Sequence, residues 1–405
     1  MFGKRTQPIL FTMAPNSNFP MMWLSTKRKD KSQVRYDFIT DKCIGKGKFG
    51  SIFEIAGTLK LTEGKIHYKQ AGHNDKTRVV KIQCHNNSQE LSETEYNLSK
   101  EAAHMAVKEP TIDGSTSYSV MRKLKGRELA DILKDDQSHK KPLTVQQRLD
   151  LTQALLKALK EQVSDCGIIH RDIKQQNILV DLNESITVNI IDYGSSAKNN
   201  DNDHKLVGSP IFMAPEIWSK SDHTEKVDVF SMARVLAFLW HLDEKTFGTK
   251  MHELPSIANQ QPNLSSLFTG IDGINPENQQ IIKTMLNGML QPKVDDRFSI
   301  EQAIAIGEEF TLNLQIDFSA IKNSSELYEH RESLLNILDA KEKQGYSIEA
   351  VKQDIEQRFA EQLHKIEEQL QRDKEECKPL KISSRIIKNI WKINLLRKGS
   401  YQKMY

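Results

Sequence analysis

The sequence predicts an α+β fold in which a small, β-rich lobe is followed by a larger helical lobe. Two observations support this class. Short runs of β-branched and aromatic residues beside glycine turns, which are typical of strands, dominate the first third of the chain. Helical patterns, with apolar residues recurring at three- and four-residue spacing, then take over, as in Thr144 to Ser164.

Composition excludes several classes of protein. With 38% hydrophobic and 27% charged residues, the 405-residue chain has the balance of a globular protein, and no segment approaches the roughly 20 apolar residues of a membrane span. The four cysteines lie far apart without a Cys-x-x-Cys pair, which argues against a zinc site and a disulfide framework and predicts a cytoplasmic location. A net charge of +3 does not indicate a nucleic-acid partner.

The expected elements follow in order along the small lobe. Residues 1–35 are predicted to be a tail that precedes the fold. A hairpin is expected from Tyr36 to Ile55, around a glycine-rich turn, and a further strand from Thr77 to Gln83. The polar stretch between them, Leu61 to Lys76, is predicted to be an enlarged loop. A helix is expected within Ser88 to Lys108.

The glycine-rich turn has the spacing Gly-x-Gly-x-x-Gly at Gly45, Gly47 and Gly50. This spacing alone is weak evidence, because dinucleotide-binding loops share it. A dinucleotide loop must run into a helix, whereas here the chain continues as the strand that begins at Ser51. We therefore expect a hairpin whose backbone amides can approach phosphate oxygens without an intervening Cβ.

Five further motifs occur in a definite order, and their residues are His170-Arg-Asp-Ile-Lys-Gln-Gln-Asn177, Asp192-Tyr-Gly194, Ala214-Pro-Glu216, Asp228 and Arg297. This set resembles the eukaryotic-type serine/threonine protein kinases, over about Tyr36 to Phe310. The resemblance implies a two-lobed protein-kinase fold that uses ATP and Mg²⁺ to phosphorylate protein substrates. It also implies structural roles for His170, for Asp228 and for a Glu216–Arg297 ion pair. Tyrosine in place of phenylalanine after Asp192 is a conservative departure.

The chemistry of phosphoryl transfer assigns roles to these residues, because the protein mostly supplies cations and alignment. Asp172 is the candidate to orient the substrate hydroxyl and accept its proton, and Lys174 to neutralise the transferring phosphate. Asn177 and Asp192 offer the hard oxygen ligands that magnesium prefers. Lys81, on a strand, is expected to grip the α- and β-phosphates.

Lys81 needs a carboxylate to aim its ammonium group. We prefer Glu95, because it is followed three residues later by the apolar Leu98, as in the family. Glu93 is the alternative, and a solvated helix face is the competing interpretation for either glutamate.

The resemblance also implies a nucleotide site around the glycine-rich turn and the segment that joins the lobes. The predicted contacts from the turn are Ile44, Gly45, Lys46, Gly47, Lys48, Phe49, Gly50 and Ile52. From the joining segment, Met121 would be the gatekeeper, backbone groups of Arg122 to Leu124 would meet adenine, and Glu128 would reach the ribose hydroxyls or a basic substrate residue.

The activation segment departs from the family pattern. Arg171 normally implies control by a phosphorylated loop, yet Ala197 to Gly208 contains no Ser, Thr or Tyr. Asp201 or Asp203 could supply a fixed negative charge near Arg171, which would leave the enzyme active without an upstream kinase.

Residues 311–405 are predicted to form a helical extension. Its apolar stripe averages more than 3.5 residues per repeat, which fits a helix packed on the kinase or on a partner better than a dimeric coiled coil, and comprises Val351, Ile355, Phe359, Leu363, Ile366 and Leu370. From Lys378 to Tyr405 there are eight Lys and Arg residues and no acid. This composition predicts a basic amphipathic helix that binds an anionic membrane surface or an acidic partner protein. Docking of the helix on its own kinase domain is the alternative.

The resulting organisation is a tail at 1–35, a kinase domain at 36–310 with lobes at 36–121 and 125–310, and the extension. The favoured function is an ATP-dependent serine/threonine protein kinase. A pseudokinase scaffold and a small-molecule kinase are the alternatives, and the first is disfavoured because Lys81, Asp172, Asn177 and Asp192 are all present. The chain also resembles kinases that intracellular bacteria inject into host cells, which would place it in the host cytosol.

Overall fold

The computed structural model of the chain describes residues 21–24, 33–47, 50–62, 65–70, 78–84, 89–105, 107–113, 115–183, 185–199, 204–310, 318–343, 346 and 348–376. The chain divides into two compact units, residues 1–313 and residues 314–405. Each unit is described by itself below.

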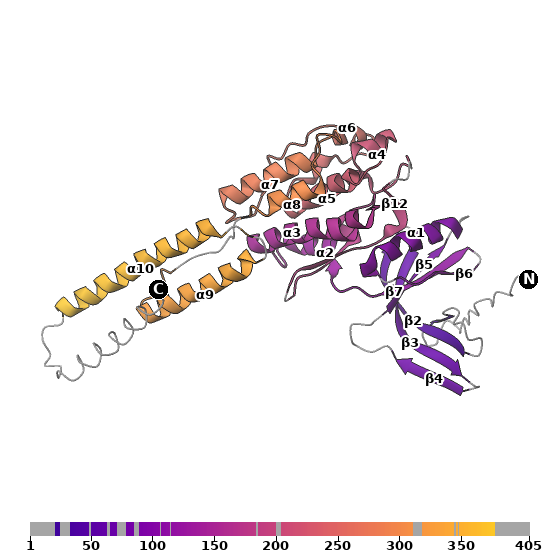
Figure 1. Cartoon of the computed structure of the whole chain (residues 1–405), viewed down its shortest axis with the longest axis horizontal. Coiled ribbons are helices and arrows are strands. Elements are labelled where there is room, and N and C mark those ends of the chain that lie inside the picture. The colour runs from indigo at the N-terminus through magenta and orange to yellow at the C-terminus, as the bar shows by residue number, and fades with distance from the viewer. Residues whose placement is uncertain are drawn as a thin grey trace, which may run out of the picture. The chain divides into compact units, whose positions relative to one another are not determined.

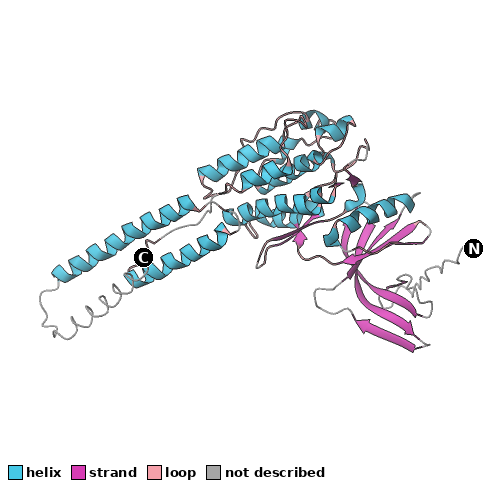
Figure 2. Cartoon of the chain, viewed as in Figure 1, coloured by secondary structure: helices cyan, strands magenta, loops and turns pink. Residues whose placement is uncertain are grey.

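A twisted antiparallel sheet forms the small lobe of the first unit (Figures 1 and 2). Its strands are β1 (Met21–Leu24), β2 (Gln33–Gly47), β3 (Gly50–Thr62), β4 (Lys65–Gln70), β5 (Arg78–Cys84), β6 (Thr111–Asp113) and β7 (Thr116–Arg122). They follow the order β1-β2-β3-β5-β7-β6, and β4 pairs with β3. Helix α1 (Gln89–Glu101) is the one long helix described in this lobe, and together these elements confirm the predicted β-rich lobe.

The β2–β3 hairpin is longer than the sequence suggested. The first part of β3 pairs with β5, whereas its continuation pairs with β4 from Gly57–Gln70 to Thr62–Lys65. The predicted loop at Leu61 to Lys76 is therefore wrong for Leu61, Thr62 and the whole of β4. Its polar composition hid the alternation of Ile66 and Tyr68 with polar residues, which is a strand signal. Residues 21–24 and 33–35 likewise lie in strands of this sheet, not in a tail before the fold.

A buried ion pair fastens this long hairpin to the rest of the sheet. Asp37 on β2 is fully buried and accepts two hydrogen bonds from Arg78 on β5, at 2.8 and 3.0 Å, and one from Thr58 on β3, at 2.8 Å. A small apolar core lies in the same sheet and comprises Ile39, Ile55, Val80, Tyr118 and Val120. Because one buried carboxylate links three strands, the hairpin and the central strands are held in one register.

Helices make up most of the large lobe (Figure 2). They are α2 (Leu129–Gln137), α3 (Val145–Gln162), α4 (Pro215–Ser219), α5 (Lys226–Leu239), α6 (Leu254–Ala258), α7 (Pro276–Met289) and α8 (Ile300–Gly307). Two small sheets accompany them, one of β8 (Arg127–Glu128), β10 (Ile178–Asp181) and β11 (Thr187–Ile190), the other of β9 (Ile168–Ile169) and β12 (Ala197–Lys198). Helix α5 is buried along its length from Val227 to Leu239, so it forms the centre of the lobe.

The described part of the second unit is a pair of helices, α9 (Ser324–Glu342) and α10 (Glu349–Glu376). Phe359 of α10 packs edge-on against Tyr328 of α9, with ring centroids 5.0 Å apart, and Arg331 pairs with Glu356. Within this unit, Ile355, Phe359 and Ile366 are buried. Part of the apolar stripe expected to meet the kinase domain or a partner thus packs against α9. The basic segment after Cys377 lies outside the described residues.

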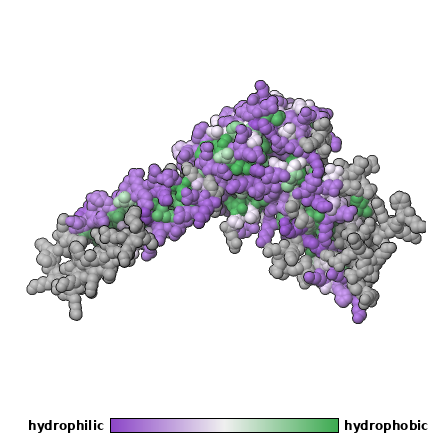
Figure 3. Space-filling model, in the orientation of Figure 1, coloured by the Kyte–Doolittle hydropathy of each residue, from purple (hydrophilic) through white to green (hydrophobic). Residues whose placement is uncertain are grey.

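The surface of the described residues is mostly hydrophilic on the face shown in Figure 3, with small, separated apolar patches. Among the described helices, none combines the length and the apolar character that crossing a bilayer requires.

Candidate active site

The geometry of the site begins with Lys81 on β5. Ile52 of β3 and Ser119 of β7 are its direct neighbours on the two flanking strands. Because side chains alternate along a strand, Met121, two residues after Ser119, lies on the same face of the sheet. The sheet thus presents Ile52, Lys81 and Met121 together, and Lys81 is buried.

The ammonium group of Lys81 meets two carboxylates. Its Nζ lies 2.7 Å from Glu95 Oε1 on α1 and 2.7 Å from Asp192 Oδ1 in the large lobe. Gln83 holds the second oxygen of Glu95, with Nε2 donating to Oε2 at 3.0 Å. The sequence analysis missed Gln83, although its position two residues after Lys81 puts it on the same face of β5. The side chain of Glu93, the alternative partner, lies outside the described residues.

Charge and burial oppose each other at this contact. Burial by itself lowers the pKa of Lys81, but the charges of Glu95 and Asp192 outweigh it, and the pKa of Lys81 is raised. Burial likewise favours the neutral form of Asp192, yet the adjacent Lys81 ammonium lowers the pKa of Asp192. Both groups are therefore charged at neutral pH, and each keeps the other so.

The catalytic-loop residues lie together on the large lobe. Lys174 Nζ donates to Asp172 Oδ2 at 2.8 Å and to the hydroxyl of Ser209 at 2.9 Å. Asn177 Nδ2 donates to the backbone oxygen of Asp172 at 2.9 Å and to its Oδ2 at 3.1 Å. Asp172 Oδ1 is buried and has no hydrogen-bond partner. One carboxylate oxygen is thus held by two donors, whereas the other accepts no hydrogen bond from the described residues.

These residues fit a divalent cation by the chemistry of their donor atoms. Because the Asn177 amide nitrogen is engaged by Asp172, its amide oxygen is the atom that remains to bind a cation. The charge of Lys81 lowers the pKa of Asp192 and keeps its carboxylate ionised. Asp192 also adopts a left-handed backbone conformation, with φ of 69°. Carboxylate and amide oxygens are the ligands that hard divalent ions prefer.

Asp228, at the start of α5, holds the backbone of this loop. Its two carboxylate oxygens accept the N–H groups of His170, at 2.6 Å, and Arg171, at 2.8 Å. Asp228 is fully buried, and burial raises its pKa to about 7, against the effect of the two N–H donors. Arg171 adopts a left-handed conformation with φ of 63°, which is uncommon for a residue with a side chain. The two bonds to Asp228 hold this conformation in place.

His170 is placed for packing and not for proton transfer. Its Nδ1 accepts the N–H of Asp172 at 3.3 Å, and its Nε2 faces the backbone oxygen of Ile191 at 3.1 Å, which together assign a neutral ring. Burial lowers the pKa of His170, in agreement with that assignment. The ring lies 4.9 Å from that of Tyr193.

The tyrosine that follows Asp192 makes a contact that phenylalanine could not. Its hydroxyl donates to the backbone oxygen of Gln162 at 3.1 Å. Gln162 in turn binds the backbone of β11 through its side chain, at Val188 and Ile190. The hydroxyl thus ties the segment after Asp192 to the end of α3.

Arg171 also binds the beginning of the activation segment. Its Nε donates to the backbone oxygen of Ser195 at 2.7 Å, and its Nη2 to that of Ser196 at 3.3 Å. The segment continues as β12, which pairs with β9 beside the catalytic loop. Asp201 and Asp203, the predicted sources of negative charge near Arg171, lie outside the described residues.

The glycine-rich turn joins β2 and β3, with Gly47 opposite Gly50. At Gly50 a Cβ would lie 2.4 Å from the backbone oxygen of Ile82, so only glycine fits there. Ile44 and Lys46 are exposed at this edge of the lobe. Lys48 and Phe49 lie outside the described residues.

The segment that joins the lobes places the remaining predicted nucleotide contacts. Arg122 is exposed and donates through Nη2 to the backbone oxygen of His104 at 2.9 Å, and Leu124 is half-buried. Glu128 lies on β8, opposite Leu179 of β10. Burial, followed by the nearby charge of Asp131, raises the pKa of Glu128.

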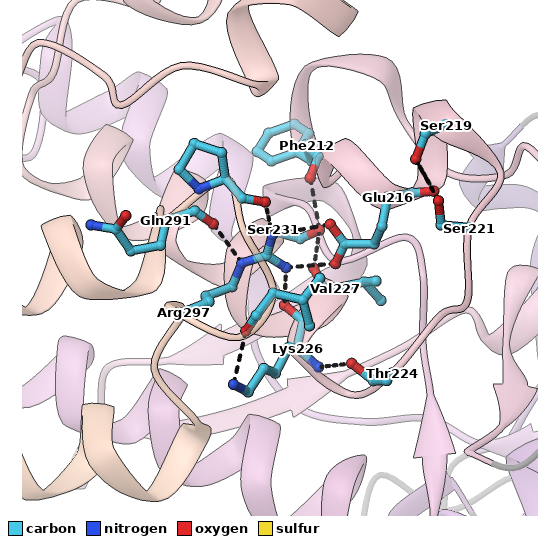
Figure 4. A network of polar contacts seen from close by, with 12 residues as sticks. Phe212, Glu216, Ser219, Ser221, Thr224, Lys226, Val227, Ser231, Gln291 and Arg297 are labelled. Carbon is cyan, nitrogen blue, oxygen red and sulfur yellow. Dashed lines mark hydrogen bonds and ion pairs between the residues drawn. The ribbon is translucent and has the colours of Figure 1, made fainter.

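A second buried ion pair supports the segment that follows the catalytic residues (Figure 4). The Arg297 guanidinium donates to both oxygens of Glu216, at 2.6 and 3.0 Å, and to the backbone oxygens of Gln291, Pro292 and Lys226. Arg297 also lies over the ring of Phe230 on α5, 4.9 Å from its centroid. The pair joins three parts of the lobe.

Comparison with known proteins agrees with this geometry. A family described as the protein kinase domain matches residues 38–306. The chain belongs to the protein kinase family. The match spans both lobes, and it implies the use of a nucleotide and a divalent metal ion in general.

Individual relatives are more distant and longer. A serine/threonine-protein kinase of Drosophila simulans is 24% identical over 283 residues, which cover 67% of this chain and 35% of that protein. A probable serine/threonine-protein kinase of Plasmodium falciparum is 28% identical over 201 residues, covering 49% and 36%. The serine/threonine-protein kinase CLA4 of Saccharomyces cerevisiae is 38% identical over 122 residues, covering 28% and 14%. The chain thus spans about a third or less of the length of these relatives.

The Glu216–Arg297 pair yields a prediction about stability. Glu216→Gln leaves the Arg297 guanidinium, whose side chain is fully buried, without a counter-charge. We expect the free energy of unfolding, measured by urea denaturation, to fall by about 3 kcal/mol. The matched control is Glu101→Gln, which removes the partner of Lys198 in an exposed pair and should cost less than about 0.5 kcal/mol. Equal losses in the two variants would contradict the prediction.

Proposed function

We propose that this protein is an ATP-dependent kinase that transfers the γ-phosphate to serine and threonine hydroxyls of protein substrates. The observation that carries the proposal is the pair of 2.7 Å contacts that join Lys81 to Glu95 and to Asp192. Through these contacts a cation from the sheet, a carboxylate from α1 and a carboxylate beside the catalytic loop meet at one point. The names of the relatives support serine and threonine as acceptors.

On this proposal Lys81 binds the α- and β-phosphates of ATP. The Glu95 carboxylate fixes the direction of the ammonium group, and Gln83 fixes that carboxylate. Such positioned charge is most effective where water is excluded, and Lys81 lies in such a place. The predicted contacts of the glycine-rich turn, and of Met121, Arg122, Leu124 and Glu128, would surround the rest of the nucleotide.

Asp172 is the proposed catalytic base. Its free oxygen, Oδ1, would orient the substrate hydroxyl and accept its proton as the oxygen attacks the γ-phosphorus. Lys174 is held by Asp172 Oδ2 and by Ser209, so its ammonium group is placed to neutralise the transferring phosphoryl group. Ser209 belongs to the segment that would receive the substrate, and its hydroxyl thereby links that segment to the catalytic loop.

Asn177 and Asp192 are the proposed magnesium ligands. Magnesium, when bound, neutralises the phosphate charge and helps to align the phosphates. Within the chain, Asp172 orients the Asn177 amide, and Lys81 keeps Asp192 ionised.

The extension at 311–405 is proposed to bind a partner protein or an anionic membrane surface through its basic C-terminal segment. The domain boundary at 310, the cytoplasmic location and the origin as an injected bacterial kinase remain predictions from the sequence.

The role of Asp172 is tested by Asp172→Asn. The amide keeps the shape of the side chain but cannot accept the proton, so we expect the rate of phosphoryl transfer to fall by about 10²- to 10⁴-fold with ATP affinity nearly unchanged. Steady-state kinetics on a generic protein substrate and equilibrium ATP binding provide the two measurements. A parallel loss of ATP affinity would show that Asp172 is a structural residue. Asp192→Ala is the contrasting variant, in which magnesium-dependent ATP binding should fall as well.

The acceptor residue is tested by phosphoamino-acid analysis of substrates labelled by the purified protein. We expect phosphoserine and phosphothreonine, with essentially no phosphotyrosine, because Lys174 and Ser209 form the contact that the family uses for aliphatic hydroxyl acceptors. Predominant tyrosine labelling would refute this assignment.

Regulation without phosphate is the third expectation. Because Arg171 already binds the backbone oxygens of Ser195 and Ser196, and no acceptor occurs from Ala197 to Gly208, protein made in a host free of related kinases should be active. Phosphatase treatment should change its rate by less than about tenfold, which corresponds to roughly 1.4 kcal/mol in the barrier.

An Asp201→Asn, Asp203→Asn double variant is the accompanying measurement. Lost activity in this variant would assign the negative charge to these aspartates, whereas full activity would assign the ordering of the segment to its backbone contacts with Arg171. A larger loss after phosphatase treatment of the unchanged protein would reject phosphate-free activity and point to Ser195 or Ser196 as the switch.

A further inference from the structure

Arg234 is a buried cation in the centre of the large lobe that the proposed mechanism does not use. It lies on α5 and is 2% exposed. Its guanidinium carbon is 4.7 Å from the ring centroid of Phe230 and 4.6 Å from that of Phe247, so the group is in contact with two aromatic rings. Such cation–π contacts offset part of the loss of hydration.

No carboxylate balances this charge. Among the residues that the structure describes, no Asp or Glu pairs with Arg234, and its Nε is buried without an acceptor. Burial lowers the pKa of Arg234 to about 9, so the group is still charged at neutral pH. Arg148 and Arg297, which are buried to the same degree, differ in this respect, because Arg148 pairs with Asp136 and Arg297 with Glu216.

The hydrogen bond that Arg234 does make goes to the segment that carries Ser209. Its Nη1 donates to the backbone oxygen of Ile211. One turn earlier on α5, the Ser231 hydroxyl donates to the backbone oxygen of Phe212 at 2.7 Å, as Figure 4 shows. Helix α5 thus binds two successive carbonyl groups, two and three residues after the serine that contacts Lys174.

The side chain of Ile211 points away from this anchor. It is 38% exposed, whereas Phe212 and Met213, which follow it, are buried. Helix α5 therefore holds the backbone of Ile211 and Phe212, while the apolar side chain of Ile211 lies at the surface close to the catalytic loop.

An unpaired buried charge is costly, and an apolar side chain of similar size at such a site is often neutral or stabilising. Groups that cost stability occur at functional sites, where stability and activity trade off against each other. The hydrogen bond from Arg234 to the backbone oxygen of Ile211 suggests such a function, which is to hold the backbone of this segment.

We propose that Arg234 is a positioning residue for the protein substrate, which holds the Ser209–Met213 segment in the conformation that receives the residues beside the phosphoacceptor. This inference rests on the proposed kinase function. It predicts that Arg234 acts on the affinity for the protein substrate and not on ATP or on the chemical step.

The test is Arg234→Met, which removes the charge and the donors but keeps an unbranched apolar side chain. We expect KM for a protein or peptide substrate to rise by about tenfold, the effect of losing one hydrogen bond to a charged group, with kcat and KM for ATP within about threefold of the unchanged protein. We expect the Tm to be equal or higher. The matched control is Arg148→Met, which removes the guanidinium from the buried Asp136, leaves it only His241 and the N–H of Leu143, and should lower the Tm.

Two results would overturn the proposal. An unchanged KM for the protein substrate would show that the buried charge does not serve substrate binding. A Tm that falls as far as in Arg148→Met would show that Arg234 is a structural residue like Arg148.

A second readout separates failure of this proposal from failure of the proposed kinase function. The amide hydrogens of Phe212 and Met213 bond to the backbone oxygens of Ser209 and Pro210, at 2.8 and 3.3 Å. Their exchange in the ligand-free protein should be faster in Arg234→Met than in the unchanged protein. If the unchanged protein phosphorylates nothing, the kinase assignment fails, and an unaltered exchange rate would then reject the anchoring role of Arg234 as well.

Discussion

The two hydrogen bonds that Asp228 accepts from the backbone N–H groups of His170 and Arg171 are the constraint on which the site depends. They hold the catalytic loop against α5, the most deeply buried helix of the large lobe. The position of Asp172 is therefore fixed relative to α5. They also hold Arg171 in a left-handed conformation, from which its side chain reaches the backbone of Ser195 and Ser196. The same two bonds therefore set the start of the activation segment. Because Asp228 is fully buried, its pKa is raised to about 7, and the two N–H donors oppose this effect by favouring the charged carboxylate.

Lys81 connects this part of the large lobe to the small lobe. The Asp192 carboxylate follows directly on Ile191, whose backbone oxygen faces His170, and it meets the Lys81 ammonium at 2.7 Å. Glu95 completes the contact from α1. Burial alone would favour the neutral forms of Lys81 and Asp192, and each of these two groups keeps the other charged. The position of α1, of β5 and of the segment at Asp192 is thus coupled through one cation, and any ligand that competes for Lys81 will act on all three.

The sequence predicted most of what depends on short motifs. Residue type and spacing predicted Asp172, Lys174, Asn177 and Asp192 as candidates for phosphoryl transfer, and in the structure Lys174 and Asn177 both contact Asp172. It also favoured Glu95 over Glu93 from a single apolar neighbour, and Glu95 is the residue that contacts Lys81. Contacts that depend on tertiary placement were not accessible. Tyr193 differs from phenylalanine only by its hydroxyl. The partner of this hydroxyl, the backbone oxygen of Gln162, is recognisable only once α3 and the segment at Asp192 are folded together. β4 was missed for another reason, since its polar face on the solvent side resembles a loop in composition.

A pattern in α5 shows what further signal the sequence contained. Asp228, Ser231 and Arg234 are the polar residues of an otherwise apolar run, and they recur every three positions, which places them along one side of the helix. Each binds backbone and not another charged side chain: Asp228 binds the catalytic loop, Ser231 binds Phe212, and Arg234 binds Ile211. A purely structural core would have no need of such a stripe, because apolar residues pack as densely without the cost of desolvation. Polar residues at helical spacing inside a buried helix therefore indicate where loops of defined conformation are fastened. In this chain they connect the loop that carries the proposed catalytic base and the segment proposed to receive the substrate to a single helix.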